Sequence, residues 1–79
     1  MNLFAIPSSS FIHYAEFIPD VEKDKYENED VGTLLLDLEG QEYEFLGVPF
    51  IDYRNLVNAG SPGSYFHFFI MNQYSYNRR

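Results

Sequence analysis

The sequence predicts one α+β domain, with a three-stranded antiparallel β-meander followed by two short helices and an extended C-terminal tail. In the first half of the chain, apolar and polar residues alternate, as is typical of strands with one buried face. After Pro49, apolar residues recur instead at helical spacing. A length of 79 residues provides one hydrophobic core, so residues 1–79 are expected to form a single domain.

The predicted strands cover residues 11–18, 32–39 and 42–46. The first strand is rich in aromatic and β-branched residues and ends before Pro19. An acidic loop insertion, residues 20–31, separates it from the second strand and has too little apolar content to be buried.

A turn around Gly40 joins the second and third strands, since glycine accepts the positive φ of a tight hairpin. A turn at residues 39–40 places Asp37 opposite Glu42, whereas a turn at residues 40–41 places it opposite Glu44. Both registers put four acids on one solvent-facing surface: Asp37, Glu39, Glu42 and Glu44. Like charges opposite each other cost up to about 1 kcal/mol, so the surface is either tolerated in water or used to bind a partner.

Two helices are expected after Pro49, which suits the first position of a helix because it has no N–H to bond. The first helix is expected to end at Gly60 in the left-handed conformation. Ser61 and Pro62 then provide the N-cap and the first residue of the second helix.

The second predicted helix carries more aromatic side chains than one face can bury. Phe66, Phe69 and Ile70 are expected to face the core, which leaves Phe68 pointing outward beside Tyr65. An exposed aromatic pair is typical of a protein interface or a homodimer. Eight Phe and seven Tyr exceed what one small core can hide, so some other tyrosines are also expected at the surface, with Tyr14, Tyr26, Tyr74 or Tyr76 as the candidates.

Charge is distributed unevenly along the chain. All twelve acids lie between Glu16 and Asp52 against two lysines, which gives that segment a net charge of −10. The residues after Asp52 include three arginines and no acid. Most of the surface is therefore expected to repel a phosphate backbone and to attract basic partners.

The residue types that carry catalysis or hold metals are scarce. The chain has no cysteine, and its two histidines, His13 and His67, do not form the i, i+4 pair that is typical of a metal site. None of the serines has a nucleophile-elbow setting. We therefore expect no catalytic residue, no metal and no cofactor, and a protein that is not an enzyme.

Several short motifs follow one another in a fixed order. These are Tyr43–Glu44–Phe45, Gly47–Val48–Pro49, Ser61–Pro62–Gly63 and Tyr74–Ser75–Tyr76. In this order and spacing, the chain from Ser8 onward resembles the KTSC domain, a family named for the C-terminus of some lysyl-tRNA synthetases. The family also occurs as free-standing small proteins in bacteria and phages.

The resemblance implies a β-meander followed by two helices, no known reaction, and a suspected role in RNA binding. Two departures from the family pattern argue against that role. Similar domains carry Arg or Lys in and just after the second helix, where this chain has none from Tyr65 to Gln73. The loop of residues 20–31 is also longer and more acidic.

The leading hypothesis is a non-enzymatic domain that binds a protein partner through its acidic strand face and through Tyr65 and Phe68. A narrower version is a phage-type inhibitor whose acids imitate the phosphates of a nucleic acid and occupy a basic surface of the partner. The alternative is RNA or tRNA binding, with bases stacked and phosphates contacted by Tyr74, Tyr76, Arg78 and Arg79. A homodimer is a third possibility. The chain shows no apolar run of membrane-spanning length and no secretory leader pattern, so a cytoplasmic location is expected.

Overall fold

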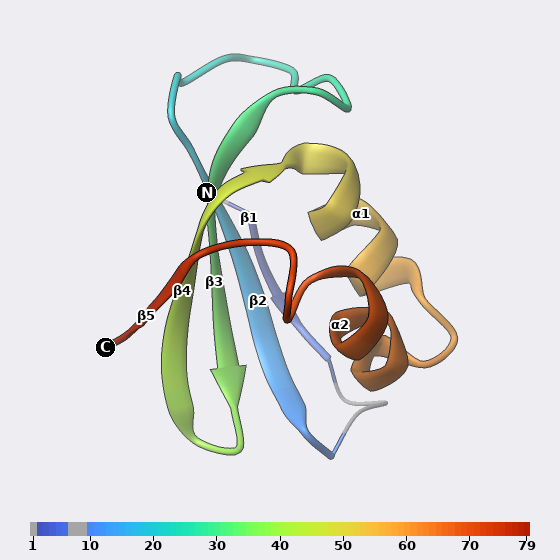
Figure 1. Ribbon diagram of the computed structural model, residues 1–79. Coiled ribbons are helices and arrows are strands. Elements are labelled where there is room, and N and C mark those ends of the chain that lie inside the picture. The colour runs from blue at the N-terminus through green and yellow to red at the C-terminus, as the bar shows by residue number, and fades with distance from the viewer. Residues whose placement is uncertain (1, 7–9) are drawn as a thin grey trace.

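A five-stranded antiparallel sheet with two helices against one face forms the domain in the computed structural model (Figure 1). The structure describes residues 2–6 and 10–79, and side chains from Ala5 onward within those ranges. The elements are β1 (Asn2–Ala5), β2 (Ile12–Pro19), β3 (Val31–Leu38), β4 (Gln41–Pro49), α1 (Phe50–Asn58), α2 (Pro62–Phe69) and β5 (Tyr76–Arg78).

The order of strands in the sheet is the order along the chain, β1-β2-β3-β4-β5, and every neighbouring pair is antiparallel. The predicted meander is confirmed as β2, β3 and β4. The predicted count of three strands is wrong, because β1 and β5 extend the sheet at its two edges. These edge strands have four and three residues, too few for an alternating pattern to stand out in the sequence.

The hairpin between β3 and β4 has a two-residue turn at Glu39 and Gly40. Leu38 pairs with Gln41 and Asp37 with Glu42, which selects the first of the two predicted registers. Both turn residues have positive φ, 54° and 90°, as a type I′ turn requires. The selected register places Glu39 in the turn, so it does not share the strand face on which both predicted registers had put it.

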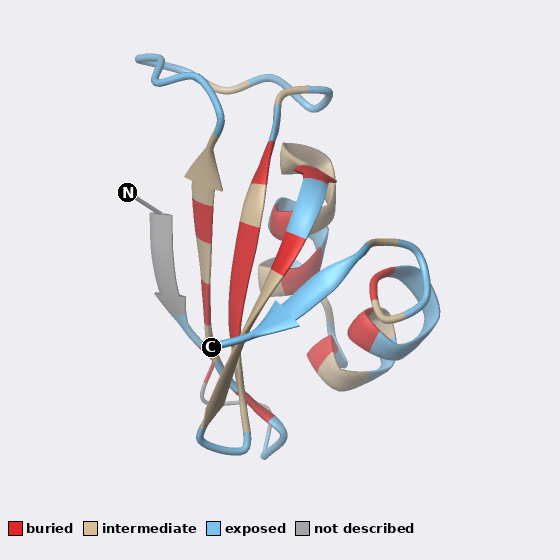
Figure 2. Cartoon of the chain, turned by 60° about the vertical axis from the view of Figure 1, so that its left-hand side comes forward, coloured by how far each residue is buried: buried red, intermediate tan, exposed pale blue. Residues whose placement is uncertain are grey.

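Apolar side chains from the inner face of the sheet and from both helices form one core. Figure 2 shows them as buried positions along the central strands and on the inward sides of α1 and α2. The core cluster consists of Ile6, Ile12, Ala15, Phe17, Leu34, Leu36, Phe45, Val48, Tyr53, Leu56, Phe66 and Ile70. Leu35, on the opposite side of β3, is also buried.

The acidic loop between β2 and β3 lies against α1. The ring of Tyr26 contacts those of Phe17 and Phe50 at centroid distances of 5.8 and 5.7 Å. The Phe50 N–H at the start of α1 donates to the Asp30 carbonyl at 2.7 Å, which satisfies one of the unpaired donors of the helix terminus. Lys23 forms an ion pair with the Asp30 side chain at 2.7 Å.

The helix boundaries differ from the prediction at two positions. Pro49 was predicted to be the first residue of the helix. It is instead the N-cap of α1 and the last residue of β4. Gly60 does not adopt the left-handed conformation, because α1 ends at Asn58 and Ala59 already continues in an extended conformation. Ser61 and Pro62 are the N-cap and the first residue of α2, as predicted.

Candidate interaction surfaces

Three predicted acids lie on the sheet face opposite the helices. Successive side chains of a strand point to opposite faces, and Leu36 and Phe45 belong to the core on the helix side. Asp37, Glu42 and Glu44 therefore point away from the helices, with Asp37 and Glu42 directly opposite each other. Glu39, the fourth predicted acid, lies in the hairpin turn between β3 and β4.

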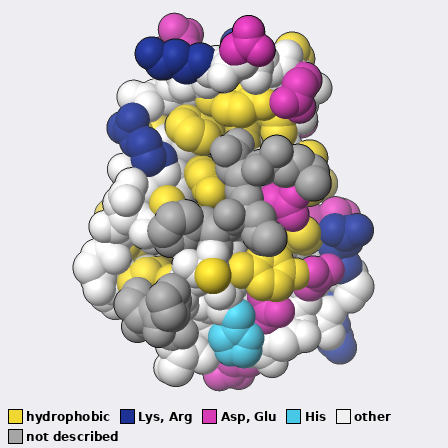
Figure 3. All heavy atoms as spheres, turned by 180° about the vertical axis from the view of Figure 1, so that it is seen from behind, with side chains coloured by type: hydrophobic (Ala, Val, Ile, Leu, Met, Phe, Trp, Pro, Cys, Tyr) yellow, Lys and Arg dark blue, Asp and Glu magenta, His cyan; other side chains and the backbone are white. Residues whose placement is uncertain are grey.

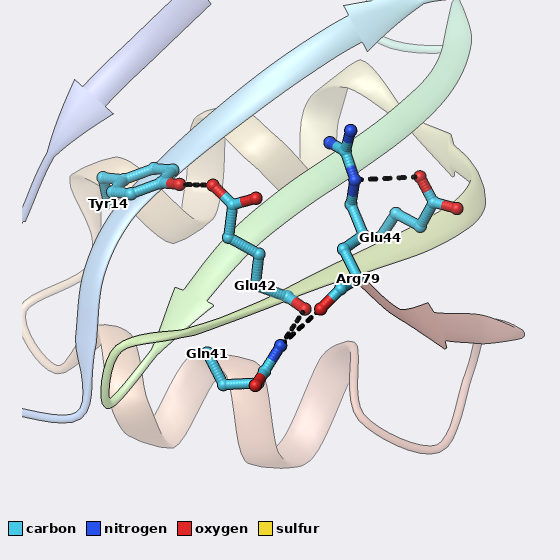
Figure 4. A network of polar contacts seen from close by, with 5 residues as sticks. All are labelled: Tyr14, Gln41, Glu42, Glu44 and Arg79. Carbon is cyan, nitrogen blue, oxygen red and sulfur yellow. Dashed lines mark hydrogen bonds and ion pairs between the residues drawn. The ribbon is translucent and has the colours of Figure 1, made fainter.

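Two of these acids are engaged by side chains from β2 and from the residue that follows β5 (Figure 4). The Tyr14 hydroxyl of β2 donates a hydrogen bond to the Glu42 carboxylate. Arg79 Nε lies 3.9 Å from Glu44 Oε2, and the Arg79 carbonyl accepts a hydrogen bond from Gln41 Nε2 at 2.6 Å. The C-terminal residue is thus anchored on the face that carries the acids.

Asp37 is engaged within its own hairpin. Its Oδ1 accepts the Gly40 N–H at 2.7 Å and lies 3.4 Å from Nδ1 of His13. On the side of the molecule seen in Figure 3, acidic side chains are interspersed with apolar, basic and uncharged ones. Three of the four predicted acids therefore share the face, and each has a partner in the fold.

Tyr65, Phe68 and Phe69 form the second candidate, called here the α2 aromatic surface. Residues three and four apart share one helix face, so these three side chains lie on the same side of α2. Phe68 is 69% exposed and Phe69 is 55% exposed. The ring of Phe69 contacts that of Tyr65 with centroids 4.7 Å apart.

The prediction for Phe68 is confirmed and that for Phe69 is wrong. Phe66 and Ile70, four residues apart, supply the contact of this segment with the core and are 4% and 0% exposed. Because α2 has only eight residues and lies at the rim of the sheet, its buried stripe is too narrow to include Phe69.

The four residues of the RNA-binding hypothesis are not brought together. Antiparallel partners share a face, and Tyr76 pairs with Phe45 and Arg78 with Tyr43, so both point to the helix side of the sheet. Arg79 points to the other side, toward Glu44. The Tyr74 hydroxyl donates a hydrogen bond to a carboxylate of α1.

That carboxylate belongs to Asp52, which joins three segments of the fold. Its Oδ1 accepts the Tyr65 hydroxyl at 2.8 Å, and its Oδ2 accepts the Tyr74 hydroxyl. Burial and the hydrogen bond to Asp52 raise the pKa of Tyr74 to about 12, and burial also raises the pKa of Tyr65. This cluster was not predicted from the sequence. The available signal was that Asp52 is the one acid in the helical half of a chain rich in tyrosine.

Among the described residues, no three His, Asp or Glu side chains converge in a geometry that could hold a metal ion. His13 and His67 are both exposed, His13 on β2 and His67 on α2. Neither helix in the described part of the chain has the length and apolar content needed to cross a bilayer.

The family model of the KTSC domain matches residues 8–74 of the 79-residue chain. The match includes the meander, both helices and Tyr74, and the chain therefore belongs to the KTSC domain family. No curated protein matches the sequence.

Proposed function

We propose that this member of the KTSC domain family is a non-enzymatic protein-binding module whose contact region is the α2 aromatic surface. The observation that carries the proposal is the exposure of two adjacent phenylalanines, Phe68 and Phe69, on a helix that already buries Phe66 and Ile70. Aromatic side chains that a monomer leaves in water are the usual anchors of protein interfaces, because each buries a large area on binding.

The support for this surface comes from its rigidity as well as its exposure. Tyr65 is held by the Asp52 carboxylate and contacts the ring of Phe69, so these two of the three rings are restrained before a partner arrives. An ordered surface loses less conformational entropy on binding than a mobile one.

The overall charge supports a basic partner. The net charge of −7 attracts positively charged proteins over distances of about a Debye length and raises the rate of encounter. The partner would combine basic residues that respond to this charge with an apolar groove that receives Phe68 and Phe69.

The narrower hypothesis of nucleic-acid mimicry finds less support than binding through aromatics. A mimic needs free carboxylates, whereas Glu42 accepts the Tyr14 hydroxyl and Glu44 lies beside Arg79. Glu39 lies in the hairpin turn. The contribution of these acids is proposed to be long-range attraction rather than direct contact.

The experiment compares the proteins captured by the wild-type chain with those captured by two double variants. Phe68→Ser with Phe69→Ser should remove the specific protein from an eluate of the native host, and Glu42→Lys with Glu44→Lys should retain it with slower association. The captured protein is then purified and titrated calorimetrically against each variant. Equal affinity for wild type and the serine variant would refute the proposal, whereas a loss confined to the lysine variant would favour mimicry.

RNA binding is a second candidate, favoured by one arrangement at β5. Tyr76 is 55% exposed and shares a sheet face with Arg78, so one residue could stack on a base while the other contacts a phosphate. Titration of labelled tRNA and single-stranded RNA at about 50 mM salt tests it, since phosphate contacts weaken steeply as salt rises. No binding at that salt concentration would end this candidate.

A further inference from the structure

The outer edge of β5 is an open strand edge with a defined pattern of backbone groups. β5 follows β4 at the end of the sheet order, and in the described part of the chain β4 is its neighbour. The Leu46 N–H donates to the Ser75 carbonyl, and the Arg79 N–H donates to the Glu42 carbonyl, both at 2.9 Å.

Antiparallel strands bond to a given neighbour through every second residue. Ser75, Asn77 and Arg79 therefore direct their backbone groups toward β4, with Asn77 in register with Glu44. The N–H and C=O groups of Tyr76 and Arg78 point the other way, away from β4.

We propose that a second copy of this chain occupies this edge, with the two β5 strands antiparallel and Asn77 at the twofold axis. In that register Tyr76 of one copy lies opposite Arg78 of the other, and the reverse holds at the symmetric position. These are the two residues of β5 whose backbone groups point outward, so both pairs exchange two hydrogen bonds across the axis.

The side chains fit the same register. Opposite residues share a face, so the guanidinium of Arg78 meets the exposed ring of Tyr76 from the second copy, a favourable cation–π geometry. Arg79, the remaining cation of this segment, points to the other face and is directed at Glu44. The edge therefore carries a self-complementary pair rather than two opposing charges.

An apolar groove beside β5 extends the contact. It has a volume of about 170 Å³ and is lined by Phe11, Leu38, Tyr43, Phe45, Phe66, Met71 and Tyr76. The groove lies on the sheet face where Tyr76 and Arg78 point, so the stem of the second copy's Arg78 would cover its rim. A stable dimer buries about 800 Å² per partner, far more than a three-residue strand offers. The dimer is therefore weak, with a dissociation constant on the order of 100 µM.

Analytical ultracentrifugation of the full chain from about 10 µM to about 1 mM tests the proposal, because this range brackets the expected dissociation constant. We expect the wild type to shift from monomer to dimer over this range. Arg78→Pro removes an outward N–H without touching the bonds to β4 and should remain monomeric. Arg78→Ala keeps the N–H, loses both cation–π contacts, and should weaken the dimer about tenfold.

The matched control is Arg54→Ala, which removes the same charge from the exposed side of α1 and should dimerise as the wild type does. Near-ultraviolet circular dichroism of every variant confirms that the aromatic core is unchanged. A wild type that is monomeric at 1 mM overturns the inference. So does a dimer that survives Arg78→Pro but is lost in Phe68→Ser, which would assign the contact to the α2 aromatic surface instead.

Discussion

The Tyr74 hydroxyl, from the segment that leads into β5, donates a hydrogen bond to the Asp52 carboxylate in the first turn of α1. The same carboxylate accepts the hydroxyl of Tyr65 from α2 at 2.8 Å. One acid thus ties two helices and the C-terminal segment together. Its negative charge also lies near the helix N-terminus, where the macrodipole favours it.

Replacement of Asp52 by alanine should lower the free energy of unfolding by about 2–3 kcal/mol, because two hydrogen bonds to a charged acceptor are lost and two hydroxyls lose their partner. Urea denaturation monitored by circular dichroism measures the change. Asp24→Ala, in the exposed part of the acidic loop, is the control and should stay within about 0.5 kcal/mol of wild type. A similar small loss for Asp52→Ala would contradict the assigned role.

Tyr74 should make the protein less stable at alkaline pH. Its folded pKa, about 12, lies above the ordinary value of 10.0, so its stabilising effect is complete below pH 10 and is lost as the pH rises toward 12. Tyr74→Phe lacks this proton linkage and should show a shallower decline of unfolding free energy over that interval. Urea titrations at several pH values measure the slope, and parallel profiles for the two proteins would refute the prediction.

Gly32→Ala should be strongly destabilising. A Cβ at this buried position would lie 2.4 Å from the Ile18 carbonyl oxygen and 2.8 Å from the Cα of Pro19, both backbone atoms of β2. The sheet would have to shift, at a cost of about 2–3 kcal/mol. Gly63→Ala is the matched control in α2, since its Cβ meets nothing within 4 Å. Alanine there should raise stability by about 0.5–1 kcal/mol, and equal effects at the two sites would contradict the packing described.

Glu39→Asn should stabilise the β3–β4 hairpin. Glu39 has a φ of 54°, a left-handed conformation that costs a glutamate more than it costs an asparagine. The expected gain is about 0.5–1 kcal/mol in unfolding free energy, measured by thermal and urea denaturation. The converse test is Gly40→Ala, which places a Cβ at a φ of 90° and should lower stability. A stabilising Gly40→Ala would show that the turn has a different geometry.

The central part of the fold could be predicted because each element satisfies a local rule. Tyr43 and Phe45 alternate with Glu42 and Glu44, and Gly40 marks a tight turn. Ser61 and Pro62 mark the start of α2. They do so although the Ser61 hydroxyl does not cap the helix and forms a hydrogen bond with the Ser64 hydroxyl instead. Such signals are present in a few neighbouring residues and need no tertiary information.

The remaining features depend on contacts between distant segments. The four residues of β1 become a strand because β2 offers them a partner, with Leu3 opposite Glu16. Phe69 and Phe66 are equally apolar in the sequence, and only the position of α2 at the rim of the sheet decides which is buried. The pairing of Asp52 with Tyr74 spans 22 residues and leaves no local pattern.

The order of the strands has a consequence for how the chain folds. Neighbouring strands in the sheet are also consecutive strands along the chain, and β1 to β4 are connected by loops alone, so these four can form by successive loop closure. β5 reaches β4 only after both helices, from Phe50 to Phe69, have been placed between them. We therefore expect β5 to join late in folding and to be the first strand released when the protein begins to unfold.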